Sequence, residues 1–267
     1  MGSSDISFAL SSKGGDREGR RWVVTSDTIL SSMAASLLPQ IRYAVEAILP
    51  PDQCPGHYDM KLSDIEKIGK ADLLISFKGM SFFHKVSSGK RAQLWVETGG
   101  RNWMVPDAYL FGLEVLAEGL VAHFPEDREE ILKRKGEVIL RVKEVSRALT
   151  EKMKTAGVAG KAMIASSMQK GFLEWMGFRV VGEYGRPESI SAREVIRLSK
   201  IGREQKAVAV VDNLQSGPEA GKGIAEALGV PHVVLTNFPS EKGYLATLQE
   251  NVEILLSTLK GRGENPF

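Results

Sequence analysis

The sequence predicts an α/β protein with parallel sheets, and three observations lead to that class. Short apolar runs rich in strand-forming residues alternate with helical patterns in both halves of the chain. Buried strands separated by crossover helices form parallel sheets covered on both faces. The length of 267 residues suits two domains, each with its own core. A long helical pattern lies between the halves.

The expected strands form two groups of four. The first group comprises residues 22–25, 42–49, 72–77 and 93–97, and the second comprises residues 162–165, 179–183, 207–211 and 232–235. The helical patterns between them cover residues 28–38, 63–69, 168–176, 191–201, 218–228 and 244–259.

The pattern between the halves runs from Pro125 to about Thr155, with Gly136 as its only internal glycine. Its apolar residues follow a 3.6-residue period in one narrow stripe, and charged residues lie between them. A helix of about 28 residues would be about 42 Å long, and Asp127 is a candidate for its N-cap. Two interpretations stay open here: a long surface helix, or a rigid connection between two lobes.

These patterns predict four regions. Residues 1–20 are expected to be a tag or a disordered N-terminus, because Met1-Gly2-Ser3-Ser4 is typical of a tag remnant. Residues 21–124 form an N-terminal α/β lobe, residues 125–156 the linking helix, and residues 157–262 a C-terminal α/β lobe.

Composition excludes several classes of protein. The formal charge of +2 argues against a dedicated nucleic-acid binder. The charged fraction of 25% and the apolar fraction of 43% are those of a folded globular chain. No apolar run approaches the ~18 residues of a membrane span. Cys54 is the only cysteine, which excludes an internal disulfide and a zinc site of several thiolates.

Several stretches, in order, resemble the TroA-like solute-binding proteins of zinc- and manganese-type ABC importers. Leu49-Pro50-Pro51, then Cys54-Pro55-Gly56-His57-Tyr58-Asp59 and Ser63-Asp64-Ile65, is similar to that family's proline-rich loop. Residues 70–75, 103–106, 233–236 and 244–251 resemble later segments of the family. The resemblance implies two Rossmann-like lobes with parallel sheets, joined by one long interdomain helix.

The departures from the family pattern concern its metal ligands. The family binds a divalent cation with three histidines and a carboxylate. Carried over by position, these ligands fall on Gly56 (with His57 one residue later), Arg101, Ser166 and Thr236. The guanidinium of Arg101 is always protonated and would repel a cation. The resemblance therefore implies the family's scaffold without its usual metal ligands.

The carboxyl ends of the expected strands supply the candidate lining of a ligand site. A guanidinium, hydroxyls and backbone amides suit an anion, a carboxylate or a negatively charged metal chelate. Ser166 and Ser167 are expected to cap the helix that follows them. Aromatic residues lie near these loops, more often as packing than as ligand contacts. The expected ligand-binding residues are Arg101, Ser166, Ser167, Thr236, Asp212, Ser26 and Trp103.

A second candidate is the Cys54–His57 pair. A thiolate and an imidazole on one Pro-Gly turn can hold a soft or borderline metal ion, if further ligands join them. The alternative is a tight turn whose cysteine is a small apolar residue.

Motifs for nucleotide chemistry are incomplete. Residues 217–223 have three residues between the relevant glycines and a glycine after the lysine, so they do not form a phosphate-binding loop. No dinucleotide fingerprint follows Thr25, and no Gly-x-Ser-x-Gly motif occurs.

The resemblance and these residues together predict a non-enzymatic, extracytoplasmic solute-binding protein that delivers its cargo to an ABC permease. The expected cargo is an anion or metal complex held through Arg101, or alternatively a metal ion held by Cys54 and His57. The protein is expected to be a monomer, periplasmic or anchored as a lipoprotein, with no nucleic-acid partner. No cofactor is assigned, and a transition-metal ion or metal chelate is a candidate cargo. An enzyme using the cleft between the lobes, or an adhesin, are the rival interpretations.

Overall fold

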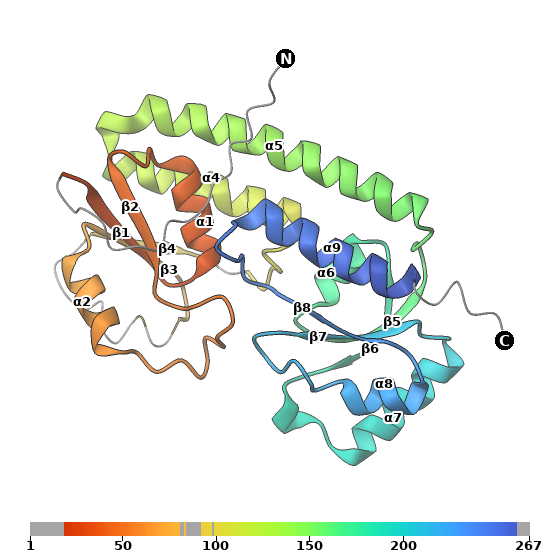
Figure 1. Ribbon diagram of the computed structural model, residues 1–267. Helices are drawn as coiled ribbons and strands as arrows, with labels where there is room; N and C mark the ends of the chain where they lie inside the picture. Colours follow the sequence, from red (N-terminus) through yellow and green to blue (C-terminus); the bar gives the residue numbers. More distant parts are fainter. Residues whose placement is uncertain (1–18, 81–82, 84–91, 98, 261–267) are drawn as a thin grey trace. The chain divides into compact units, whose positions relative to one another are not determined.

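The computed structural model describes residues 19–80, 83, 92–97 and 99–260. It divides into two compact units (Figure 1). Unit 1 comprises Met1–Gly100, Asp107–Lys143 and Phe238–Thr247, and unit 2 comprises Arg101–Pro106, Glu144–Asn237 and Leu248–Phe267. Most of the expected tag or disordered N-terminus lies outside the described residues. In the described part of the chain, no helix is both long and apolar enough to cross a membrane.

Unit 1 contains a parallel sheet in the order β2-β1-β3-β4. The inner strand β3 is buried along its whole length, as is usual in parallel sheets, and the inner strand β1 leads directly into α1. Helix α2 packs on one face of the sheet, where Ile68 joins a cluster with Val24 and Leu74. Helices α1 and α4 lie on the other face (Figure 1). The elements are β1 (Arg21–Thr25), α1 (Thr28–Leu37), β2 (Tyr43–Ala47), α2 (Leu62–Lys70), β3 (Leu73–Phe77), β4 (Ala92–Val96) and α4 (Pro106–His123).

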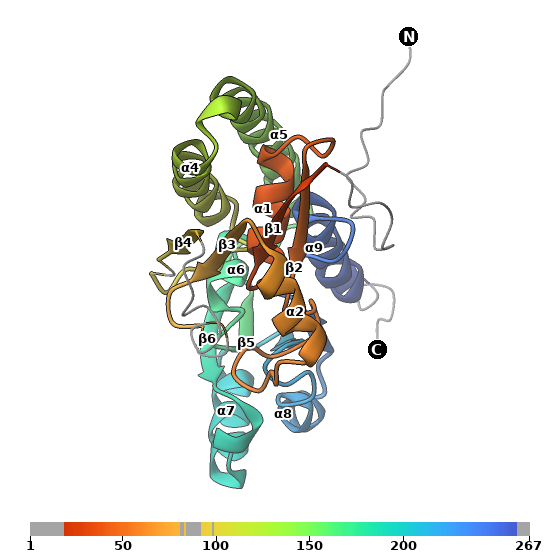
Figure 2. The same cartoon turned by 90° about the vertical axis from the view of Figure 1, so that its left-hand side faces the viewer.

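Unit 2 contains a second parallel sheet in the order β6-β5-β7-β8. Helices α7 and α8 pack on one face, where Leu198 and Ile224 join Ile164 and Val210 in a buried cluster. Helix α6 and most of α9 lie on the opposite face (Figures 1 and 2). The elements are β5 (Ala162–Ser166), α6 (Lys170–Trp175), β6 (Arg179–Tyr184), η2 (Pro187–Ser189), α7 (Ala192–Glu204), β7 (Ala209–Asn213), α8 (Lys222–Leu228), β8 (His232–Leu235) and α9 (Tyr244–Lys260).

All eight expected strands are present, and the α/β class with parallel sheets is confirmed. Helix α4 was not predicted. Its buried residues Tyr109, Leu113, Leu116 and Leu120 follow the helical spacing of four, three and four. Further apolar residues between them, such as Leu110 and Phe111, obscure that stripe in the sequence.

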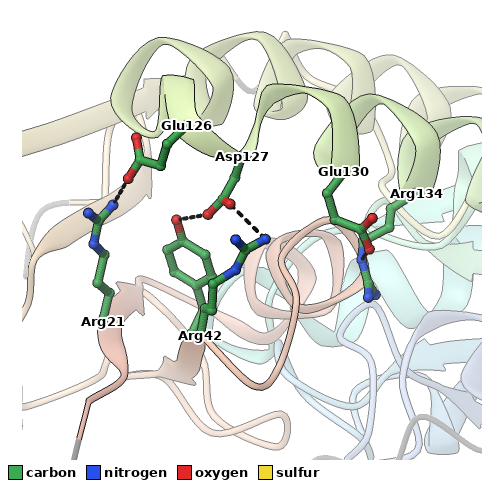
Figure 3. A network of polar contacts seen from close by, with 7 residues as sticks. Arg21, Arg42, Glu126, Asp127, Glu130 and Arg134 are labelled. Carbon is green, nitrogen blue, oxygen red and sulfur yellow. Dashed lines mark hydrogen bonds and ion pairs between the residues drawn. The ribbon is translucent and has the colours of Figure 1, made fainter.

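The long helix α5 (Arg128–Thr155) is 28 residues long, as expected, and follows the short helix η1 (Pro125–Asp127). Its first half runs beside α4 in unit 1 (Figures 1 and 2). The expected role of Asp127 as N-cap is wrong. Asp127 is the last residue of η1, and its carboxylate faces β2 instead (Figure 3).

Asp127 joins the start of α5 to the sheet of unit 1. Its carboxylate accepts a 2.5 Å hydrogen bond from the Tyr43 hydroxyl and lies 2.6 Å from the Arg42 guanidinium. Burial, together with the hydrogen bond to Asp127, raises the pKa of Tyr43 well above its ordinary value. The neighbouring Glu126 pairs with Arg21 (Figure 3). These contacts fix η1, directly before α5, to β1 and to the start of β2.

Asp127→Ala is expected to lower the free energy of unfolding by about 2 kcal/mol, because it leaves the buried Tyr43 hydroxyl without its acceptor. The matched control is Glu130→Ala, which breaks a half-exposed pair with Arg134 on the same helix and should cost at most about 0.5 kcal/mol. Urea unfolding, with hydrogen exchange of the β2 amides as the local probe, measures both. Equal effects of the two substitutions would contradict this role for Asp127.

Candidate functional site

The carboxyl end of β5 carries Ser166 and Ser167. Ser166 is buried, and its hydroxyl accepts a long hydrogen bond, 3.4 Å, from the Met168 N–H. Ser167 is exposed, and its N–H donates to the carbonyl of Tyr184 at 2.9 Å. The expected helix cap is wrong: α6 begins at Lys170, and its N-cap residue Gln169 makes no side-chain cap bond.

Thr236 follows β8, and its backbone N–H and its carbonyl are both hydrogen-bonded to one side chain. Its N–H donates to Asn251 Oδ1 at 3.2 Å, and its carbonyl accepts from Asn251 Nδ2 at 2.8 Å. Its hydroxyl accepts from Gln215 Nε2 at 2.7 Å. The position that the resemblance pairs with the family's carboxylate is therefore a hydroxyl within an amide network.

Asp212 lies in β7 and is completely buried. One carboxylate oxygen accepts from the Tyr184 hydroxyl at 2.7 Å. The other accepts from the Gly221 N–H at 2.8 Å and lies 2.6 Å from His232 Nε2. Burial and the charge of Asp212 raise the pKa of Tyr184 far above its ordinary value. This carboxylate therefore holds together elements of unit 2 and has three partners inside it.

Arg101 and Trp103 flank Asn102 in a segment of unit 2. Arg101 is exposed, whereas Trp103 is largely buried. Asn102 Nδ2 donates to the Met168 carbonyl at 2.9 Å and to Asn237 Oδ1 at 3.2 Å. The Asn102 side chain therefore fixes the segment that carries Arg101 to the loops after β5 and β8.

Five side-chain amides join these strand ends, and we call them the carboxamide cluster. Gln169 Nε2 donates to Asn213 Oδ1 at 2.9 Å, to the Leu235 carbonyl at 3.2 Å and to Asn237 Oδ1 at 3.1 Å. Sequence reasoning missed this cluster, although a signal existed: an Asn or Gln lies at or just after the end of β5, β7 and β8. Its members are Asn102, Gln169, Asn213, Gln215 and Asn237.

Ser26 lies at the end of β1 in unit 1 and is buried. Its hydroxyl donates to Asp27 Oδ2 at 2.7 Å. Asp27 is the N-cap of α1, because its Oδ1 accepts from the N–H groups of Ile29 and Leu30 at 3.0 and 3.1 Å. Burial raises the pKa of Asp27 from 3.8 to about 6, although these hydrogen bonds act in the opposite direction.

Cys54 and His57 form a turn in unit 1, in which the His57 N–H donates to the Cys54 carbonyl at 3.1 Å. Cys54 is a free, partly exposed thiol, and the His57 side chain is exposed. Two surface hollows of unit 1, of about 460 and 250 Å³, are lined by none of the expected site residues. The expected residues thus fall into two sets: Ser26, Cys54 and His57 in unit 1, and the other six in unit 2.

Comparison with known proteins adds the decisive observation. The model of the ZnuA family, described as zinc-uptake complex component A, periplasmic, matches residues 101–258, which is more than half of the chain. The chain belongs to the ZnuA family. Members of this family are extracytoplasmic solute-binding proteins, not enzymes, and they work with ABC permeases. A comparison with curated proteins finds no match.

Solved structures show the same fold as this ZnuA-family chain at low sequence identity. A periplasmic metal-binding protein from Candidatus Liberibacter asiaticus aligns with a TM-score of 0.76 and 15% identity, over 90% of this chain and 100% of that one. The laminin-binding protein Lmb of Streptococcus agalactiae gives 0.73 and 17%, over 90% and 99%. The periplasmic zinc-binding protein TroA of Treponema pallidum gives 0.73 and 16%, over 90% and 99%. The expected TroA-like relationship is confirmed.

Among the expected site residues of unit 2, Asp212 alone is of a type that commonly binds zinc. Protein zinc sites take three or four ligands from Cys, His, Asp and Glu. In the described part of the chain, no three such side chains form a group that could hold a metal ion. The ends of β5 and β8 offer serine, threonine and amide groups, and Asp212 already has three partners.

Proposed function

We propose that this ZnuA-family protein captures a small anion or a negatively charged metal complex for its ABC permease, in place of a bare divalent cation. The observation that carries this proposal is the chemistry of the strand ends of unit 2. The Thr236 hydroxyl accepts from the Gln215 carboxamide, and Asn102, the residue after Arg101, is hydrogen-bonded to the loops after β5 and β8.

The charges favour this cargo. A guanidinium keeps its charge at every physiological pH and binds carboxylates and phosphates through paired N–H groups. The carboxamide cluster has no net charge. An anion entering these loops gains hydrogen bonds, whereas a bare cation meets a positive charge.

The test combines elemental analysis of the purified protein with thermal-shift titrations. The probes are zinc, manganese, phosphate, citrate and ferric citrate. We expect an anionic probe to stabilise the protein by about 2.7 kcal/mol at 100 times its Kd, and zinc and manganese to have little effect. Arg101→Ala should abolish the anion response, and Arg193→Ala, an exposed arginine of α7, should preserve it.

The alternative is a metal ion held by Cys54 and His57, favoured by the proximity of a free thiol and an exposed imidazole in one turn. Strong stabilisation by zinc that disappears in His57→Ala would establish that alternative and contradict the proposal. An anion response that survives Arg101→Ala would contradict the role given to Arg101.

A further inference from the structure

Gln169 has a buried oxygen without a partner. The residue is fully buried, and among the residues that the structure describes none donates a hydrogen bond to its Oε1. The other branch of the same amide, Nε2, is turned toward Asn213 Oδ1, the Leu235 carbonyl and Asn237 Oδ1. Exchanging the two branches would place an oxygen against three acceptors, so the hydrogen bonds fix the present orientation.

An unpaired buried acceptor is uncommon, because burial removes its hydrogen bonds to water without replacing them. All the neighbouring amides named above are engaged: Asn102 and Asn237 donate to the Met168 carbonyl, and Asn213 Nδ2 donates to Ser216. The carboxamide cluster therefore leaves a single sealed acceptor, and its missing partner is a hydrogen-bond donor.

This acceptor lies close to the loop that carries Arg101. Asn237 Oδ1 accepts from both Gln169 Nε2, at 3.1 Å, and Asn102 Nδ2, at 3.2 Å. Asn102 directly follows Arg101 in the chain. Asn102, the residue after Arg101, and the Gln169 amide with its unsatisfied oxygen thus belong to one hydrogen-bonded framework.

We propose that Gln169 recognises a hydroxyl or N–H donor on the captured solute, which makes the cargo a hydroxylated organic anion, free or as a metal chelate. This inference rests on the proposed function, since Arg101 binds the anionic groups. Gln169 then determines specificity, because only a solute that carries a donor can satisfy this oxygen.

The test compares two tricarboxylates that differ by one group, citrate and tricarballylate, which lacks the hydroxyl. Isothermal titration of the wild type should show citrate binding at least about tenfold more tightly, the value of one well-made hydrogen bond. Gln169→Met should remove this preference while both ligands still bind. Gln205→Met, the same substitution at the exposed end of α7, should leave the preference unchanged.

The outcomes separate the two proposals. Equal affinity of the wild type for citrate and tricarballylate overturns the role of Gln169 and leaves the anion receptor standing. Binding of neither tricarboxylate nor ferric citrate, together with tight zinc binding, overturns the proposed function itself. The comparison of citrate with tricarballylate on the wild type tests the role of Gln169 even if Gln169→Met fails to fold. An ordered water on Gln169 Oε1 that persists in a citrate-bound crystal structure also overturns the inference.

Discussion

Replacing Gly221 by alanine is expected to destabilise unit 2 by about 3 kcal/mol, the upper part of the range for overpacked cores. A Cβ at this position would lie 2.7 Å from Val210 Cγ1 and 2.8 Å from Tyr184 Cζ, and closer still to the tyrosine hydroxyl. Neither group can move cheaply. Val210 belongs to a buried strand, and the Tyr184 hydroxyl donates to Asp212 and to the Val211 carbonyl.

Gly223→Ala, two residues later, is the matched control. Nothing lies within 4 Å of a Cβ at that position in α8, so alanine should be neutral or stabilise the helix by up to about 1 kcal/mol. Urea unfolding followed by hydrogen exchange of the β7 amides measures both variants. Similar stabilities of the two variants would show that the contact around Tyr184 relaxes at little cost.

Asp27→Asn is expected to stabilise unit 1 by about 2 kcal/mol at pH 8 and to have little effect below pH 4. The pKa of Asp27 is about 6 in the folded protein and 3.8 ordinarily. Between these values the folded state binds more protons than the unfolded state, so stability falls as the pH rises. Above pH 6 the ionised carboxylate costs about 3 kcal/mol, because each pKa unit corresponds to 1.36 kcal/mol.

Asparagine keeps the hydrogen bonds of this cap without the buried charge. Its Oδ1 can still accept from Ile29 and Leu30, and the Ser26 hydroxyl can accept from Nδ2 instead of donating. Part of the gain is offset by the lost interaction of a carboxylate with the helix dipole. Urea titrations from pH 4 to 8, with α1 amides as the probe, measure the effect. Asp52→Asn, in an exposed loop of the same unit, is the control, and parallel pH profiles for all three proteins would contradict this account.

The strands of both sheets could be predicted because buried parallel strands are short apolar runs that periodicity identifies. Helix α5 could be predicted because its apolar residues form one narrow stripe and charged residues lie on both sides of that stripe. Helix α4 could not, since its first turns are apolar on several sides and a buried helix leaves a weak periodic signal. Asp127 was placed correctly at the start of α5, but its partner Tyr43 is distant in the sequence, so its bond was not predictable.

The positions of the candidate site residues could be predicted from the sequence, but their hydrogen bonds could not. Ser166, Asp212 and Thr236 do lie at or near strand ends, as parallel topology requires. Local sequence could not show that Asp212 is enclosed by Tyr184 and His232. It also could not show that the amides after three strands pair with one another, because these pairs join residues as far apart as Asn102 and Asn237.

Asp212 has a consequence for how unit 2 loosens. Strands β6 and β8 are the two margins of the sheet, and the inner strand β7 carries Asp212. Tyr184 from one margin and His232 from the other meet on its carboxylate. If one edge strand separates from the sheet, Asp212 loses a partner and holds the opposite edge strand less firmly. The two edge strands should therefore detach together and not one after the other.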